Sequence, residues 1–128
     1  MINQIKIASA DFTARTGRAP VIACLGLAFK PDVDDLRESP ALHVTQHLTE
    51  AGYNVIAVEP NITQHATLRL ANLDEALRES DIVILLVKHK EFILHRQTIG
   101  FGASVVIDYC GINATPGQMI RSQEEAQV

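Results

Sequence analysis

Short apolar runs separated by polar, helix-forming segments set the pattern of this chain. The runs cover residues 21–26, 53–58, 81–87 and 104–108, with a weaker one at 67–70. Runs that are apolar at every position are typical of strands buried on both faces of a parallel sheet. Their alternation with helices predicts an α/β fold: a Rossmann-like, doubly wound, mainly parallel sheet of about five strands with helices on both faces.

Residues typical of helix ends predict where the intervening helices begin and stop. Ser39 can accept a hydrogen bond from a free backbone amide, and Pro40 suits the first helical position because it has no N–H to leave unpaired. Gly52 is a typical residue to end that helix. Asn72, with Glu75 three residues later, has the pattern of a capping box. Two further helices are predicted over 2–16 and 91–98.

The composition favours a single soluble domain and excludes two classes of partner. Of the 128 residues, 47% are hydrophobic and 20% charged, and the net charge is −4. An acidic chain with scattered Lys and Arg is not typical of nucleic-acid-binding proteins. No apolar run reaches the ~20 residues needed to span a bilayer. Cys24 and Cys110 lie in or beside apolar runs, so we expect two free thiols in a cytoplasmic protein.

The loop over 26–38 carries most of the candidate chemistry. Ligands of doubly wound sheets bind where strands end, beside the point at which strand order reverses. Gly26 begins this loop, but no second or third glycine follows that would let backbone approach a pyrophosphate. We therefore do not expect this domain to bind NAD by itself.

Other chemistries fit the same residues poorly. A calcium loop counted from Asp32 would need glycine at the position of Arg37 and glutamate at that of His43. His43 and His47 lie one helical turn apart, but the sequence suggests no third zinc ligand. We therefore predict no metal site. A phosphoacceptor receiver domain is disfavoured because the last strand ends in Asp-Tyr-Cys without the lysine such domains carry.

One contiguous motif points to a family. Residues 26–41, Gly-Leu-Ala-Phe-Lys-Pro-Asp-Val-Asp-Asp-Leu-Arg-Glu-Ser-Pro-Ala, closely resemble the signature of the UDP-glucose/GDP-mannose dehydrogenase family. The resemblance implies an enzyme of three parts: an NAD domain, a central helical domain that forms homodimers, and a carboxy-terminal UDP-binding domain. It also implies oxidation of a sugar C6 alcohol to a carboxylate in two NAD-dependent steps, through a thiohemiacetal on a cysteine.

The resemblance assigns roles to individual residues. Phe29 and Lys30 match positions that line the nucleotide-sugar site, and Arg37 matches one that reaches toward NAD. Cys110 stands where the family commonly has Lys or Arg, which places one substrate contact in question. Neither Cys24 nor Cys110 lies in the context of the catalytic cysteine. We therefore assign no catalytic residue and expect the isolated chain to be inactive, with NAD held mainly by an amino-terminal domain.

The resemblance also suggests boundaries and a substrate. Residues 1–18 would be the end of a helix from the central domain, with Ile5 and Phe12 free for chance packing, 19–118 the UDP-sugar-binding domain, and 119–128 a polar tail. The motif most resembles the form that acts on UDP-N-acetyl-D-mannosamine, giving the mannosaminuronate for surface polysaccharide. UDP-glucose and UDP-N-acetylglucosamine remain alternatives, as does a stand-alone nucleotide-sensing module.

Overall fold

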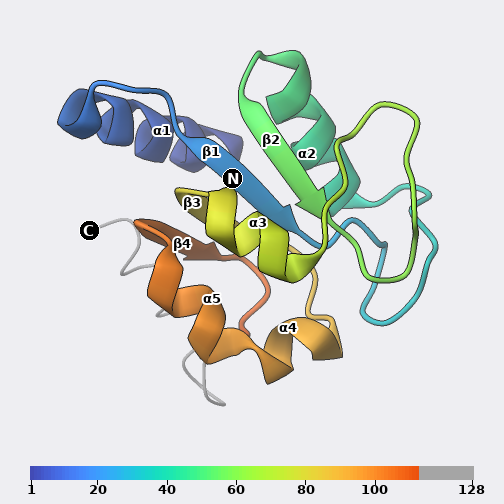
Figure 1. Cartoon of the computed structure of the whole chain (residues 1–128). Coiled ribbons are helices and arrows are strands. Elements are labelled where there is room, and N and C mark those ends of the chain that lie inside the picture. The colour runs from blue at the N-terminus through green and yellow to red at the C-terminus, as the bar shows by residue number, and fades with distance from the viewer. Residues whose placement is uncertain (113–128) are drawn as a thin grey trace.

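The computed structural model of the chain describes residues 1–112, without the side chains of 101 and 102. Helices and strands alternate along it (Figure 1). In chain order they are α1 (Ile2–Thr16), β1 (Val21–Leu25), α2 (Pro40–Glu50), β2 (Asn54–Val58), α3 (Leu73–Glu79), β3 (Ile82–Leu85), α4 (Lys90–Leu94), α5 (Arg96–Gly102) and β4 (Val105–Asp108). None of the described helices combines the length and apolarity that crossing a membrane requires.

The strands form one parallel sheet in the order β2-β1-β3-β4. The predicted fold class is therefore confirmed, but the described residues form four strands and not about five. The segment expected as a further strand, 67–70, makes only an isolated parallel bridge between Leu70 and Ala57. The N–H of Ala57 donates to Arg69 O, and the N–H of Ala71 donates to Ala57 O. Two hydrogen bonds at the edge of β2 do not extend into a ladder.

Each face of the sheet is covered by its own set of helices (Figure 1). On one face, Ile5 and Phe12 of α1 and Val44 and Leu48 of α2 pack against β1 and β3. On the other face, α3, α4 and α5 enclose a second apolar cluster that includes Phe92. Ile5 and Phe12 are 0% and 2% exposed. The expectation that they lie free is wrong, because a helix packed along the sheet buries its apolar stripe.

The helix over 2–16 and the two predicted amino-terminal caps are confirmed, whereas the helix predicted over 91–98 is not continuous. Ser39 Oγ accepts a hydrogen bond from the N–H of Leu42, and Asn72 Oδ1 accepts one from Glu75, as the capping residues predict. The single helix expected over 91–98 is instead divided into α4 and α5. The division falls at His95, whose φ of −105° and ψ of 18° lie outside the helical region.

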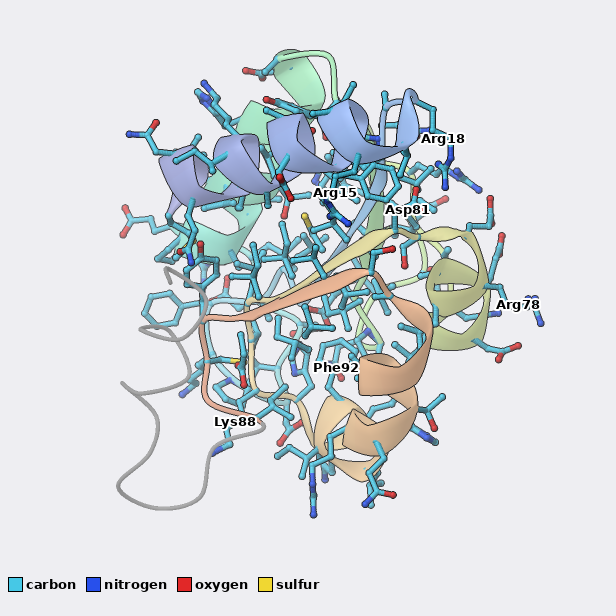
Figure 2. All side chains as sticks on the ribbon, turned by 90° about the vertical axis from the view of Figure 1, so that its left-hand side faces the viewer. Arg15, Arg18, Arg78, Asp81, Lys88 and Phe92 are labelled. Carbon is cyan, nitrogen blue, oxygen red and sulfur yellow. The ribbon has the colours of Figure 1, made fainter. Side chains whose placement is uncertain are left out.

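An ion pair ties α1 to the amino-terminal edge of the sheet. The two terminal nitrogens of Arg18 donate to the two carboxylate oxygens of Asp81 at 3.0 and 2.8 Å, and Figure 2 shows the two side chains meeting. Asp81 also accepts the N–H of Val21, and the Arg18 guanidinium lies 5.0 Å from the Phe12 ring centroid. These contacts thus join the segment after α1 and the start of β1 to the residue that precedes β3.

Candidate functional site

The sheet has one switch point, and it lies between β1 and β3. From β1 the chain continues to β2 on one side, and it later returns to β3 on the other side. Crevices of this kind, outside the carboxyl ends of the strands, are where open α/β sheets bind ligands. The loops that flank the crevice are 26–39, which holds the signature motif, and 86–89.

Gly26 allows these two loops to approach closely. Its φ is 103°, and its N–H donates to Val58 O at 2.8 Å. A Cβ added at Gly26 would lie 2.5 Å from Cβ of Val87, which is far inside van der Waals contact. Glycine is therefore required at the start of the motif for both its conformation and its size.

A buried carboxylate holds the first residues of the motif loop. Glu59 immediately follows β2 and is 4% exposed. Its Oε1 accepts the backbone N–H groups of Leu27 at 2.9 Å and Ala28 at 3.0 Å. Its Oε2 accepts the N–H and the side-chain amide of Asn61, both at 3.0 Å. Glu59 thus joins the loop after β1 to the loop after β2.

A buried histidine holds the same loop farther along. His89 is 1% exposed, and its Nδ1 accepts the N–H of Asp32 at 2.8 Å. Because Nδ1 accepts a hydrogen bond, it carries no proton, and the ring proton must be on Nε2. Nε2 therefore donates to Glu59 Oε1, 2.8 Å away. The carboxylate of Asp32 in turn accepts the N–H of Lys90, at the start of α4.

Glu59 is ionised in this setting. Burial by itself would raise the pKa of its carboxyl group. The hydrogen bond from His89 and those from the backbone of Leu27 and Asn61 outweigh this effect and lower the pKa from 4.5 to about 2. The site therefore contains a buried negative charge whose hydrogen bonds all come from the protein.

The sequence-predicted ligand residues lie on the loop that this pair holds. Phe29 is 57% exposed, and Lys30 beside it is also exposed. The N–H of Phe29 donates to Asp35 O at 2.7 Å, which closes the loop on itself. Phe29, Asp35, Arg37 and Glu38 line an open depression of about 350 Å³. The structure thus brings Phe29 and Arg37 to one surface, with Lys30 next to it in the chain.

Arg37 is paired within the loop. Its side-chain nitrogens donate to both carboxylate oxygens of Asp35, each at 3.0 Å. The hydrogen bonds from the Arg37 side chain and backbone lower the pKa of Asp35 to about 2. The Arg37 side chain remains 89% exposed. Its contact with NAD stays a prediction.

The two thiols are free, and both are held in the protonated form. Burial raises the pKa of Cys24 to about 12, and burial with the neighbouring charge of Asp108 does the same for Cys110. Both are therefore protonated at neutral pH and are poor nucleophiles. Cys110 is the second residue after β4, and the positive charge of Lys88 partly offsets the rise in the pKa of its thiol. A role for Cys110 in substrate binding stays a prediction.

The backbone amides of the motif loop are not available to a pyrophosphate. In dinucleotide-binding sheets, N–H groups after the first strand face the pyrophosphate. Here the corresponding N–H groups of Leu27 and Ala28 donate to Glu59. The residues at this crevice therefore do not fit NAD held in that way.

Glu59 and His89 were missed from the sequence. Each directly follows, or nearly follows, an apolar run that forms a strand, in Val-Glu-Pro-Asn and Val-Lys-His-Lys. The available signal was a polar residue after each of two apolar runs, because the carboxyl ends of parallel strands lie at the same edge of a sheet.

The fold and the site define a Rossmann-like ligand-binding domain with an exposed aromatic residue and cation at its switch point. A model of the UDP binding domain of the UDP-glucose/GDP-mannose dehydrogenase family matches residues 23–114. The chain belongs to this family.

Proteins that share this domain are much longer. UDP-N-acetyl-D-mannosamine dehydrogenase of Campylobacter jejuni is 52% identical over 82 residues, which cover 58% of this chain and 20% of that protein. The Escherichia coli K12 protein of the same name is 43% identical over 101 residues, covering 72% and 24%. The chain thus spans about a fifth to a quarter of the length of these relatives.

Solved structures show the same fold. The UDP-D-ManNAc dehydrogenase of Pyrococcus horikoshii superposes with a TM-score of 0.66 at 22% identity, over 87% of this chain and 26% of the other. GDP-mannose dehydrogenase of Pseudomonas aeruginosa gives a TM-score of 0.60 at 22% identity, over 84% and 28%. Identities this low establish the fold but not the ligand.

Proposed function

We propose that this chain is the nucleotide-sugar-binding domain of an NAD-dependent UDP-sugar 6-dehydrogenase of the cytoplasm. The observation that carries the proposal is the exposed pair Phe29–Lys30, presented at the switch point by a loop that buried polar groups hold. An aromatic face can stack on a uracil ring, and an ammonium can meet a diphosphate or the forming carboxylate. The net charge of −4 makes such a local cation necessary.

The proposed substrate is UDP-N-acetyl-D-mannosamine, oxidised to UDP-N-acetyl-D-mannosaminuronate for surface polysaccharide. The support is the form of the motif over 26–41 and the names of the relatives that are 43–52% identical. In this proposal the reactive cysteine and most of the NAD site belong to other domains of the enzyme, because both thiols here stay protonated. Arg37 reaches toward the NAD of those domains, and the full-length enzyme is a homodimer.

Replacing Lys30 with alanine should weaken UDP-sugar binding without affecting folding. In the full-length enzyme we expect the affinity for UDP-N-acetyl-D-mannosamine to fall by ~1.5–3 kcal/mol, the range for hydrogen bonds to a charged group. The melting temperature should stay nearly constant, because Lys30 is exposed and surface changes usually stay within ~0.5 kcal/mol. Calorimetric titration and thermal unfolding measure the two effects.

Lys6→Ala is the matched control, since Lys6 is an exposed lysine on α1, outside the two loops that flank the switch point. It removes the same charge and should leave affinity unchanged. Equal affinities for wild type and Lys30→Ala would show that Lys30 is only a solvated surface residue and would remove the main support for this site.

A further inference from the structure

We infer that Glu59 and His89 are positioning residues that hold Phe29 and Lys30 in the conformation that binds the nucleotide. This inference rests on the proposed function and adds to it the groups that set the affinity of the site. Glu59 and His89 are almost fully buried, at 4% and 1% exposed, so we place neither of them in contact with the ligand. Their effect on binding must pass through the loop.

The two residues fix the loop on both sides of the ligand-binding pair. Glu59 accepts the N–H groups of Leu27 and Ala28, which come just before Phe29. His89 accepts the N–H of Asp32, two residues after Lys30. Phe29 and Lys30 themselves point toward solvent, so their positions depend on the loop backbone, which these three anchored residues hold together with the hydrogen bond from the N–H of Phe29 to Asp35 O.

The anchored backbone is not a conformation that the chain adopts freely. Asp32 has a φ of 62°, in the left-handed region that side chains other than glycine rarely occupy. Its N–H donates to His89, and its carboxylate accepts the N–H of Lys90, so both of its polar groups are engaged in this geometry. Loss of the His89 contact removes one of the two restraints that hold it.

The charge of Glu59 is needed because both of its oxygens act only as acceptors. Oε1 faces Leu27, Ala28 and His89, and Oε2 faces Asn61. A glutamine of the same shape has one acceptor oxygen and one donor nitrogen. In either orientation of the amide, its NH₂ group therefore faces N–H donors, either those of Leu27 and Ala28 or that of Asn61.

Glu59→Gln is the first test, with two measurements on the 128-residue chain. Hydrogen exchange should become faster at the amides of Leu27, Ala28 and Asp32 and stay unchanged in β3. The dissociation constant for UDP, measured by calorimetry, should rise about 10- to 100-fold, as expected for loss of hydrogen bonds to a charged group. His65→Gln is the matched control, because His65 Nδ1 also accepts backbone N–H groups, from Thr67 and Leu68, in another loop.

Two variants of His89 test its two hydrogen bonds separately. In His89→Gln the amide NH₂ can replace Nε2 as the donor to Glu59, but the acceptor for Asp32 is lost. In His89→Asn the side-chain oxygen can replace Nδ1 and accept from Asp32, but the link to Glu59 is lost. Exchange should therefore rise mainly at Asp32 in the first variant and mainly at Leu27 and Ala28 in the second, with weaker UDP binding in both.

The double variant Glu59→Gln/His89→Asn should bind UDP no more weakly than the weaker-binding of the two single variants, because both changes break the same hydrogen bond between the two side chains.

If Glu59→Gln does not fold, the two His89 variants provide the test, since they leave the carboxylate in place. UDP affinities within about twofold of wild type in all folded variants would overturn the inference. A wild-type chain that does not bind UDP would refute the proposed function and this inference together, whereas failure of the variants alone refutes only the inference.

Discussion

Gly26→Ala should lower the free energy of unfolding by about 2–5 kcal/mol, measured by denaturant titration. A non-glycine residue at a φ of 103° is strained, and its Cβ would lie 2.5 Å from Cβ and 2.9 Å from the backbone N of Val87. The backbone of Val87 cannot move away without cost, because its N–H donates to Leu25 O. Strain and overlap therefore add at this one position.

Substitutions at two other glycines distinguish backbone strain from steric overlap. Gly17 and Gly52 have φ of 78° and 96°, but an added Cβ would meet nothing within 4 Å. Alanine at either should therefore cost only the conformational strain, ~1–2 kcal/mol. Combining Gly26→Ala with Val87→Ala should give little rescue, because alanine keeps the Cβ that is overlapped. A cost at Gly26 no larger than that at Gly52 would contradict the close approach of the two loops.

Acid should remove ~3 kcal/mol of stability through Glu59 alone. Its pKa of about 2 in the folded chain is below the ordinary value of 4.5, so the ionised carboxylate stabilises the folded state. That contribution is fully present above pH 4.5 and is lost as the pH falls through the folded pKa. Denaturant titrations at a series of pH values between 6 and 2 measure it as the slope of stability against pH.

Glu59→Gln should flatten this slope, so that the difference from wild type shrinks toward pH 2. Asp35→Asn is the comparison of interest, because the pKa of Asp35 is also about 2. Its pair with Arg37 is exposed to solvent, and pairs of that kind contribute little. A wild-type slope that survives in Glu59→Gln would show that other carboxyl groups control acid unfolding.

Local sequence patterns predicted the strands and the helix caps. Features that depend on residues far apart in the sequence were not predicted. The apolar runs that form β1 and β3 and the caps at Ser39 and Asn72 depend on a few neighbouring residues. The segment 67–70 has a plausible local pattern, yet a strand also needs a partner, and only one bridge to Ala57 forms. The break at His95 has no proline or glycine beside it to announce it.

The site divides in the same way. A contiguous motif made Phe29, Lys30 and Arg37 candidates, and the structure places them on one loop without testing their ligands. The link between Glu59 and His89 spans 30 residues and exists only because β2 and β3 both border β1. The burial of Ile5 and Phe12 was missed for a related reason. The apolar stripe of a helix does not by itself indicate which surface of the protein it packs against.

The buried carboxylate beneath the motif loop has a consequence for ionic strength. Sheets that bind phosphate through backbone amides use N–H dipoles that are shielded from solvent. Here the N–H groups of Leu27 and Ala28 already donate hydrogen bonds to the carboxylate of Glu59. Attraction for an anionic ligand then falls to exposed cations such as Lys30. Charges in water are screened beyond about 8 Å at physiological salt, and an excess of acidic residues adds long-range repulsion. Ligand capture by this domain should therefore be more sensitive to salt than capture by a glycine-rich phosphate cradle.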